Sequence, residues 1–290
     1  MKSPVSKITG LFIYILLVSL CLSQNAYAMG SSPPDRIKNA QKIASEQGMK
    51  SEYLHTSIFQ LQAWTRIKEP GKPLRVYIEG DGFAWRSVSK PSWDPTPYDP
   101  LPLFLAGLDD FPNVAYLARP CQYAGIKEDM HCEERYWTEA RFSEEVIVSM
   151  NEAVNQLKES AEARKIELVG YSGGAGVALL VAARRGDVTA LRTIAGNLEP
   201  EAVNLRHHVS PLTASLDPLD IVEKIKAIPQ SHFVGDKDDV VPLDIARHFV
   251  SLLSGGAFAE VVVNPGATHS RGWREHWREL LKRPLPGSSA

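Results

Sequence analysis

The feature that most constrains the fold of this sequence is a serine between glycines at residues 170–174, Gly-Tyr-Ser-Gly-Gly. An apolar stretch precedes it at residues 166–169, and a run of small and apolar residues follows it. This order predicts a strand, a sharp turn and a helix. So tight a turn leaves no room for flanking side chains, which Gly170 and Gly174 lack, and it exposes the hydroxyl of Ser172 above the sheet.

The same turn has a second interpretation as a glycine-rich phosphate-binding loop. That reading requires the spacing Gly-x-x-x-x-Gly-Lys-Ser, which is not found here. The positive end of the following helix would instead stabilise a developing oxyanion. We therefore predict that Ser172 is a nucleophile and that the backbone N–H of Gly173 is one oxyanion donor.

Strands and helices alternate along most of the chain. Strands are predicted within residues 52–67 and at 74–78, 113–117, 166–169, 191–195, 232–235 and 259–263. Helices are predicted at 31–47, 143–159, 173–185, 243–253 and 271–282, with short helical stretches in 197–229. Such alternation predicts an α/β fold with a mostly parallel central sheet and helices on both faces.

The order of elements predicts one folded domain and no linker. Residues 29–71 would supply a helix and the first strands, residues 72–283 the core, and residues 284–290 a disordered tail. Residues 91–102 hold five prolines, which argues against a helix or a central strand there. We expect a long surface excursion that is either functional or a rigid cover.

A serine nucleophile needs a base and an orienting acid. His269 follows the last predicted strand, and an acidic group follows the strand before it. Because the carboxyl ends of parallel strands meet at one edge of a sheet, both reach the edge where the serine emerges. The candidates for the acid are Asp236, Asp238 and Asp239. His248 and His276 lie in helical patterns and are interpreted as surface or packing residues.

These motifs together resemble the α/β-hydrolase superfamily across residues 72–282. The order Ser, Asp, His matches, and the family's acid in a Gly-x-x-Asp-x-x-Val-Pro stretch falls on Asp238. The stretch Arg-Pro-Cys-Gln-Tyr at 119–123 resembles an exported branch of that superfamily. The resemblance implies a triad of Ser172, Asp238 and His269.

The oxyanion loop departs from the family pattern. Where that family usually has His-Gly after the third strand, this chain has Glu-Gly-Asp-Gly at residues 79–82. A backbone N–H can serve whatever the side chain, so we expect the first donor at Asp81 or Gly82.

The first 28 residues are typical of a secretory leader. Lys2 and Lys7 precede an apolar stretch at 11–22, and Ala-Tyr-Ala at 26–28 suits cleavage. This stretch of twelve residues, apolar apart from Ser19, falls short of the roughly 20 that span a membrane, so we expect no transmembrane span in the mature protein. Lipidation at Cys21 is a less favoured alternative. The prediction is a periplasmic or secreted protein.

Export changes how the cysteines are interpreted. Cleavage leaves Cys121 and Cys132, and two thiols in an oxidising compartment predict one disulfide. Two buried free thiols are the alternative. Two cysteines are too few for a structural zinc site, and His207 and His208 have no acid or thiol at metal spacing nearby. We predict no metal and no cofactor.

Composition excludes several classes of protein. The 290 residues carry 32 basic and 34 acidic side chains, and 44% are hydrophobic. These values exclude a disordered chain and argue against a nucleic-acid partner. We predict an exported serine hydrolase that cleaves a small-molecule or lipid-like carboxylic ester. Acyl transfer or peptide cleavage by the same triad, or a non-catalytic binding domain, are the alternatives. The oligomeric state is left open.

Three aromatic residues flank the proline-rich excursion. Trp85, Trp93 and Tyr98 would either line an acyl pocket or pack beneath this cover.

Overall fold

The structure is a computed structural model that describes residues 32–87, 89–123, 131–253 and 257–287. The predicted leader at 1–28 and the end of the predicted tail lie outside these residues. Among the helices described, none is both long and apolar enough to cross a membrane.

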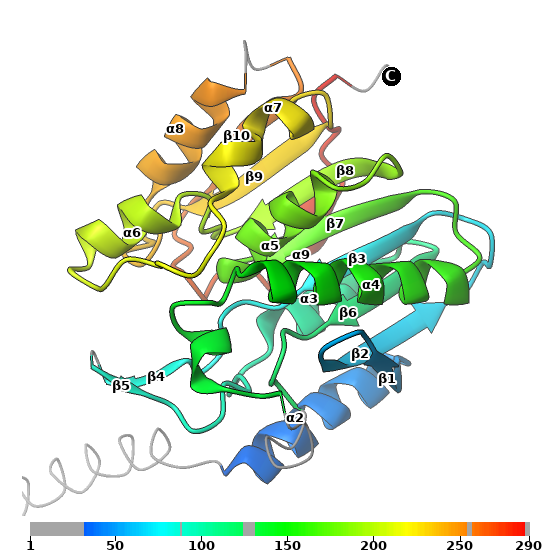
Figure 1. The fold of residues 1–290 in the computed structure, drawn as a ribbon. Helices are drawn as coiled ribbons and strands as arrows, with labels where there is room; N and C mark the ends of the chain where they lie inside the picture. The colour runs from blue at the N-terminus through cyan, green and yellow to red at the C-terminus, as the bar shows by residue number, and fades with distance from the viewer. Residues whose placement is uncertain (1–31, 88, 124–130, 254–256, 288–290) are drawn as a thin grey trace, which may run out of the picture.

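An eight-stranded sheet forms the centre of the described chain, in the order β1-β2-β6-β3-β7-β8-β9-β10 (Figure 1). Its strands are β1 (Lys50–His55), β2 (Gln60–Ile67), β3 (Leu74–Ile78), β6 (Asn113–Leu117), β7 (Ile166–Tyr171), β8 (Val188–Ile194), β9 (Gln230–Gly235) and β10 (Ala259–Asn264). β2 is antiparallel to β1 and β6, and the strands from β6 to β10 pair in parallel. The predicted mostly parallel sheet is confirmed.

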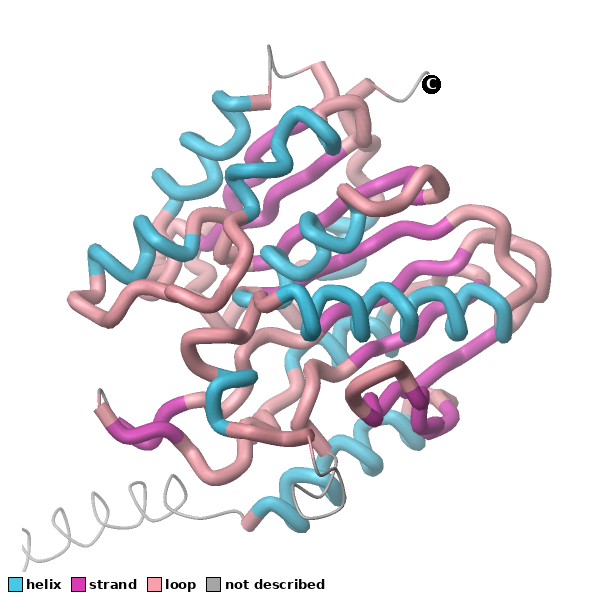
Figure 2. Tube along the Cα trace, viewed as in Figure 1, coloured by secondary structure: helices cyan, strands magenta, loops and turns pink. Residues whose placement is uncertain are grey.

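Helices pack on both faces of this sheet (Figures 1 and 2). They are α2 (Pro33–Glu46), α3 (Leu101–Leu108), α4 (Glu144–Ser160), α5 (Gly173–Ala182), α6 (Pro200–Arg206), α7 (Val222–Ile225), α8 (Leu243–Leu252) and α9 (Trp277–Leu281), with 3₁₀ turns η1 (Glu134–Trp137) and η2 (Pro218–Ile221). Buried residues of α4, α5 and α8 share one apolar core, and those of α2, α3 and α9 share the other.

The strand β3 shows how the two cores are separated. Val76 and Ile78 lie in the core with α4 and α5, whereas Tyr77 lies in the core with α3 and α9. Successive side chains of a strand point to opposite faces, so a strand buried on both sides carries apolar residues throughout. All five residues of β3 are buried, as expected for a strand that lies between β6 and β7 in the interior of the sheet.

The proline-rich segment differs from its prediction. It contains a two-residue strand, β5 (Lys90–Pro91), that pairs with β4 (Trp85–Ser87), and the helix α3 begins within it at Leu101. Pro102 fits the first turn of α3 because the N–H groups there need no helical partner. Thr96 is fully buried. The prediction that this range holds no helix and lies on the surface was therefore wrong in part.

The final helix is shorter than predicted. The pattern from residue 271 predicted a helix to 282, but α9 comprises only Trp277–Leu281. Gly272 has φ +85°, which is outside the helical region and ends any helix there. The preceding residues form a loop in which the indole N–H of Trp273 donates to the carbonyl of Thr268 at 3.0 Å. This loop carries His269.

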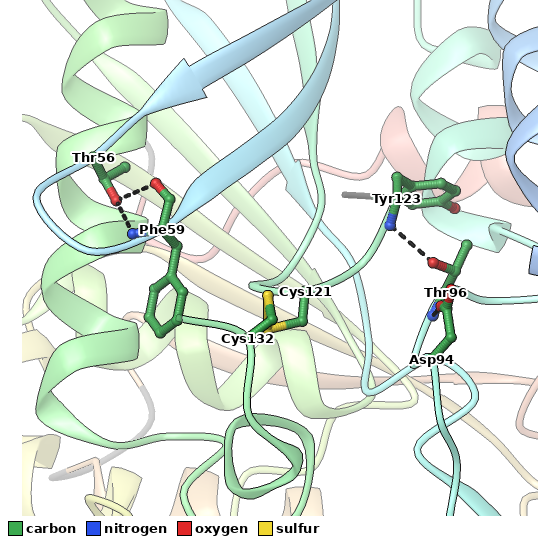
Figure 3. The surroundings of a disulfide bond; sticks show 7 residues. All are labelled: Thr56, Phe59, Asp94, Thr96, Cys121, Tyr123 and Cys132. Carbon is green, nitrogen blue, oxygen red and sulfur yellow. Dashed lines mark hydrogen bonds between the residues drawn. A yellow bond between two sulfur atoms is a disulfide. The ribbon is translucent and has the colours of Figure 1, made fainter. Parts of the chain in front are cut away.

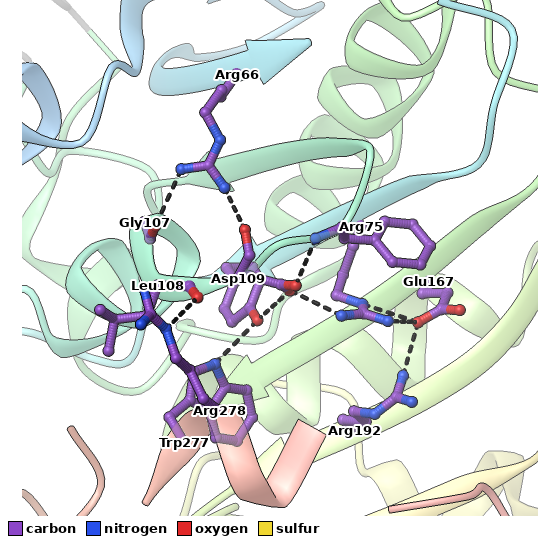
Figure 4. Close-up of polar contacts among 11 residues, drawn as sticks. Arg66, Arg75, Gly107, Leu108, Asp109, Glu167, Arg192, Trp277 and Arg278 are labelled. Atoms are coloured by element: carbon purple, nitrogen blue, oxygen red, sulfur yellow. Dashed lines mark hydrogen bonds and ion pairs between the residues drawn. The ribbon is translucent and has the colours of Figure 1, made fainter. Parts of the chain in front are cut away.

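A buried ionic network lies near the amino ends of β3 and β7 (Figure 4). Arg75 donates to Asp109 at 2.8 Å and to Glu167 at 2.8 Å, and Arg192 donates to Glu167 at 2.6 Å. Tyr77 also donates to Asp109, at 2.6 Å. The carboxylate of Asp109 is buried and joins the end of α3 to the sheet.

Candidate active site

The turn between β7 and α5 places Ser172 at the carboxyl edge of the sheet. Its backbone has φ 50° and ψ −122°, a conformation that non-glycine residues rarely adopt. The N–H of Ser172 donates to Ile194 at 3.0 Å, and its carbonyl accepts from Ala175 at 3.0 Å and from Asn197 at 2.9 Å. These three bonds hold the strained turn in place.

The neighbouring glycines are required by close backbone contacts. A Cβ on Gly170 would lie 2.5 Å from the Cα of Ala175, and one on Gly174 would lie 2.4 Å from the carbonyl oxygen of Glu79. A real Cβ atom does not approach a non-bonded atom this closely. The start of α5 can therefore approach β3 and β7 only because both positions lack a side chain. The structure thus explains the two glycines by packing.

The imidazole of His269 lies between the serine and an acid. Its Nε2 is 2.9 Å from the hydroxyl of Ser172, and its Nδ1 is 3.0 Å from Oδ2 of Asp238. The tautomer with its proton on Nδ1 donates to the carboxylate and accepts from the hydroxyl. The three side chains therefore lie in one hydrogen-bonded line, in which a base can take the serine proton while an acid steadies the charge that results.

Asp238 is fixed on the side away from the histidine. Its Oδ1 accepts from the N–H groups of Val240 and Val241, both at 2.9 Å, and its side chain is fully buried. These two hydrogen bonds fix the orientation of the carboxyl group. Its position in the turn after β9 thus supplies an oriented acceptor for the imidazole.

The rival candidates lie elsewhere. Asp236 accepts from the N–H of Gly266 at 2.6 Å and supports the loop before the histidine, whereas Asp239 is exposed. His248 contacts Glu199 at 2.8 Å, and His276 contacts Asn264 at 2.8 Å. The structure brings none of these four to Ser172.

Glu79 lies next to the serine and was not assigned a role from the sequence. It is buried, and it accepts from the N–H of Gly80 at 2.8 Å and from the hydroxyl of Tyr116 at 2.8 Å. Burial outweighs these bonds and raises the pKa of Glu79 to about 8. A carboxyl after a strand carries no burial signal in the sequence, so this environment follows from the fold.

The predicted oxyanion loop is held by two arginines. Asp81 lies 3.4 Å from Arg119 and 3.4 Å from Arg141, and both arginines are nearly buried. A Cβ on Gly173 would lie 2.1 Å from Oδ1 of Asp81, so the carboxylate sits against the start of α5. A bare carboxylate there would oppose a developing oxyanion, and the arginines offset that charge.

Gln122 ties the same loop to the segment after β6. Its amide donates to the carbonyl of Gly80 at 3.0 Å and accepts from the N–H of Arg119 at 3.0 Å. The next residue, Tyr123, donates its N–H to Thr96 at 2.8 Å (Figure 3). Residues of the Arg-Pro-Cys-Gln-Tyr stretch therefore position the loop that was predicted to hold the oxyanion. In the sequence, only the presence of this stretch pointed to such a role.

The predicted disulfide joins Cys121 to Cys132 (Figure 3). Their Cα atoms are 5.4 Å apart, within the range that a disulfide spans. Cys121 has φ 69° and lies directly before Gln122. The bond therefore fixes the backbone beside the predicted oxyanion loop.

A cleft of about 220 Å³ opens over the serine hydroxyl. It is lined by residues of the oxyanion loop, the proline-rich segment and the catalytic candidates: Glu79, Asp81, Gly82, Phe83, Pro97, Tyr98, Asp99, Tyr171, Ser172 and His269. Of the three aromatic residues predicted for an acyl pocket, Tyr98 lines this cleft. Trp85 and Trp93 lie outside it, with 43% and 76% of their surface exposed. Among the described residues no cluster of three metal-ligating side chains occurs.

The mostly parallel sheet with a serine at the β7–α5 turn defines an α/β-hydrolase. The model of the dienelactone hydrolase family matches residues 117–275, more than half of the chain. The chain therefore belongs to the dienelactone hydrolase family, and its reaction class is hydrolysis. No curated protein matches it in sequence.

Solved structures support the same fold. An α/β serine hydrolase homologue from Coxiella burnetii is 19% identical, with a TM-score of 0.56 over 80% of this chain and 95% of its own. The esterase Pf2001 from Pyrococcus furiosus is 14% identical, with a TM-score of 0.58 over 84% and 93%. A bacterial membrane phospholipase A is 16% identical, with a TM-score of 0.53 over 92% and 97%.

Proposed function

We propose that this protein is an exported serine hydrolase that cleaves a carboxylic ester. The observation that carries the proposal is the line from Ser172 through His269 to Asp238, with contacts of 2.9 Å and 3.0 Å, at the floor of the cleft. Family membership gives hydrolysis, and this line supports a serine as the nucleophile. The names of two structural neighbours, an esterase and a phospholipase, support an ester as the substrate.

The reaction proceeds in two halves. The oxygen of Ser172 attacks the ester carbonyl, and its proton passes to Nε2 of His269 and then to the departing alcohol as the C–O bond breaks. Water then attacks the acyl-enzyme, and His269 takes the water proton and returns it to the serine oxygen. Asp238 holds the imidazole and stabilises its charged form in both halves.

The oxyanion is assigned to backbone N–H groups, as the sequence suggested. Gly173 stands at the first position of α5, where the helix dipole favours negative charge. The loop of Asp81 and Gly82 would supply the other donor, and Gln122, Arg119 and Arg141 keep that loop in position. The loss of one such donor typically lowers the rate by about 10²–10³.

Export rests on the leader at residues 1–28, and the disulfide is consistent with it because such bonds persist in oxidising compartments. A small-molecule or lipid-like ester is the expected partner.

The ester assignment is tested with matched substrates. A p-nitrophenyl ester and the p-nitroanilide of the same acyl group differ only in the bond that breaks. The proposal predicts a kcat/KM for the ester at least 10²-fold above that for the anilide after correction for uncatalysed hydrolysis, whereas comparable corrected values would indicate a peptidase. Added glycerol as acceptor distinguishes acyl transfer, because a transferase would form the glycerol ester in preference to free acid.

A further inference from the structure

The strands β4 and β5 form a small hairpin that extends away from the sheet and its helices (Figure 1). Trp85 pairs with Pro91, and Ser87 pairs with Lys90. All three residues of β4 are exposed, and so is Lys90. We call residues 83–87 and 89–93 the aromatic hairpin; the residue between them lies outside the described chain.

The base of the aromatic hairpin is anchored firmly. The N–H of Phe83 donates to Pro95 at 2.9 Å, and the N–H of Ser92 donates to Ala84 at 2.8 Å. Arg36 of α2 lies over the rings of Phe83 and Tyr98 and donates to Thr96. The exposure of the outer part is therefore not the exposure of a loose loop, since its base is buttressed by α2.

The composition of the aromatic hairpin differs from that of the chain. It holds three aromatic side chains and two basic ones, with no acid, whereas the whole chain has a net charge of −2. Trp93 is 76% exposed and Trp85 43%, and the guanidinium of Arg86 lies 3.4 Å from the centre of the Trp93 ring. Exposed apolar surface that is rimmed by polar groups is typical of an interaction surface, and here the exposed indole rings lie beside two basic side chains.

The hairpin adjoins the active-site cleft. The ring centres of Phe83 and Tyr98 are 4.7 Å apart, and both residues line the cleft above Ser172. A surface that contacts the outer hairpin would therefore lie beside the mouth of the cleft.

We propose that the aromatic hairpin docks on the surface of an anionic phospholipid bilayer. Tryptophan side chains prefer the membrane–water interface, where an apolar ring meets polar headgroups. Arg86 and Lys90 supply the charge that attracts anionic lipid, each adding to binding within a Debye length of the surface. The inference concerns binding and does not depend on the proposed catalysis.

The experiment measures vesicle binding by co-sedimentation. The protein is the processed form purified from the periplasm of an expressing bacterium, carrying Ser172→Ala so that no lipid is hydrolysed. The vesicles are phosphatidylcholine alone or phosphatidylcholine with 30 mol% phosphatidylglycerol, at low salt and at high salt. We expect binding to the anionic vesicles that exceeds binding to the neutral ones by about tenfold or more and falls at high salt. Equal binding to both, or binding to neither, overturns the proposal.

Two hairpin variants and two matched controls locate the surface. Arg86→Glu with Lys90→Glu is expected to lower the anionic partition coefficient roughly tenfold or more, and Trp93→Ala is expected to lower it severalfold. Tyr53→Ala removes a 49% exposed aromatic from β1, and Lys226→Glu with Lys282→Glu reverses two exposed charges elsewhere. The controls should bind as the parent does.

Thermal midpoints keep the comparison interpretable. The substituted positions in the hairpin and in the controls are all exposed, so all four variants should melt within a few degrees of the parent. If the controls lose as much binding as the hairpin variants, the hairpin is not the docking surface. Retention on an amylose or chitin resin without vesicle binding would assign the tryptophans to a sugar and would also overturn the proposal.

Discussion

Two groups of buried polar residues occupy opposite ends of the same strands, β3 and β7. Near the amino ends, Arg75, Asp109, Glu167 and Arg192 form a closed ionic network (Figure 4). At the carboxyl end of β7, Ser172 opens on a cleft. The cleft end also holds buried, hydrogen-bonded carboxyl groups, those of Glu79 and Asp238, beside the half-buried Ser172. Burial of acidic side chains therefore does not by itself distinguish a functional site from a structural one.

Backbone strain separates the two ends. Among the described residues, six non-glycine residues have positive φ. Two of them, Ser172 and Ala195, directly follow strands β7 and β8, and two more, Cys121 and Tyr123, lie in the segment after β6. No member of the ionic network is among the six. Strain of this kind persists only where the surroundings enforce it, and it collects at functional sites.

The pairing of the acids also differs. Each carboxylate of the ionic network contacts an arginine within 2.8 Å. Glu79, at the cleft, takes its hydrogen bonds from the neutral groups of Gly80 and Tyr116, and its pKa is raised to about 8. Ion pairing joins the strands at one end, whereas the other end holds one buried carboxyl group, that of Glu79, whose pKa lies near neutral pH.

The largest difference between the ends should appear on replacing Ser172. Ser172→Ala is expected to lower kcat by about 10⁴–10⁶ because it removes the nucleophile, while the thermal midpoint changes little. The control Ser172→Gly should be equally inactive but more stable by about 1 kcal/mol, because glycine tolerates φ 50°. Ester hydrolysis by either variant above a mock purification would remove Ser172 from the mechanism.

Asp238→Asn is the next largest effect. Loss of the carboxylate leaves the imidazole in the wrong tautomer, an effect on the order of 10⁴ in kcat in serine proteases with this triad. Asp236→Asn and Asp239→Asn are the matched controls and should stay within about tenfold of the parent, since neither contacts His269. If Asp236→Asn were inactive and Asp238→Asn active, the acid would be Asp236 and the assignment to Asp238 would be wrong.

Asp109→Asn tests the opposite end of the sheet. Removing one partner of a buried ion pair costs roughly 3–5 kcal/mol, so the free energy of unfolding should fall by that amount. The kcat/KM of the enzyme that stays folded should match that of the parent. Asp110→Asn, at the exposed neighbouring position, is the control and should be neutral in denaturant titrations. A selective loss of kcat/KM would show that the network serves the site.

Glu79→Gln sharpens the contrast in proton binding. The folded pKa of about 8 lies above the ordinary value of 4.5, so between these two pH values the folded chain holds a proton that the unfolded chain releases. The parent should therefore lose stability as pH rises through this window, by a few kcal/mol, and the glutamine variant should lose less. Parallel pH curves from urea titrations of the two proteins would contradict the raised pKa.

The disulfide gives the smallest expected effect. Replacing both Cys121 and Cys132 by alanine should lower the free energy of unfolding by about 3 kcal/mol, as chain entropy predicts for so short a loop. The bond lies beside the oxyanion loop rather than in the hydrogen-bonded line, so KM should rise more than kcat falls. An unchanged midpoint in guanidinium would show that the bond does not constrain the unfolded chain.

The elements that the sequence predicted well are those with local signals. Ser143 caps α4 through a bond from the N–H of Val146, and the helix follows the apolar spacing that predicted it. Gly170 and Gly174 stand where the start of α5 approaches β3 and β7 so closely that no other residue fits. The positions of Asp238 and His269 at one edge follow from parallel strand order, although their catalytic roles remain a proposal.

What the sequence did not predict depends on contacts between distant residues. The burial of Asp109 could not be predicted from its neighbours in the sequence, because its partner Arg75 lies 34 positions away. Glu79 and the arginine pair around Asp81 acquire their environments only when β6 lies against β3. The start of α3 was missed because prolines argue against helices in general, although the first turn tolerates them.

The most direct test of the proposed mechanism is labelling of the processed protein with a fluorophosphonate, followed by mass spectrometry of the modified peptide. The hydrogen-bonded line of Ser172, His269 and Asp238 predicts one label per chain, on Ser172, with labelling strongly slowed in Asp238→Asn and absent in Ser172→Ala. No labelling of the parent, or a label on another residue that persists in Ser172→Ala, would contradict the assignment of Ser172 as the nucleophile.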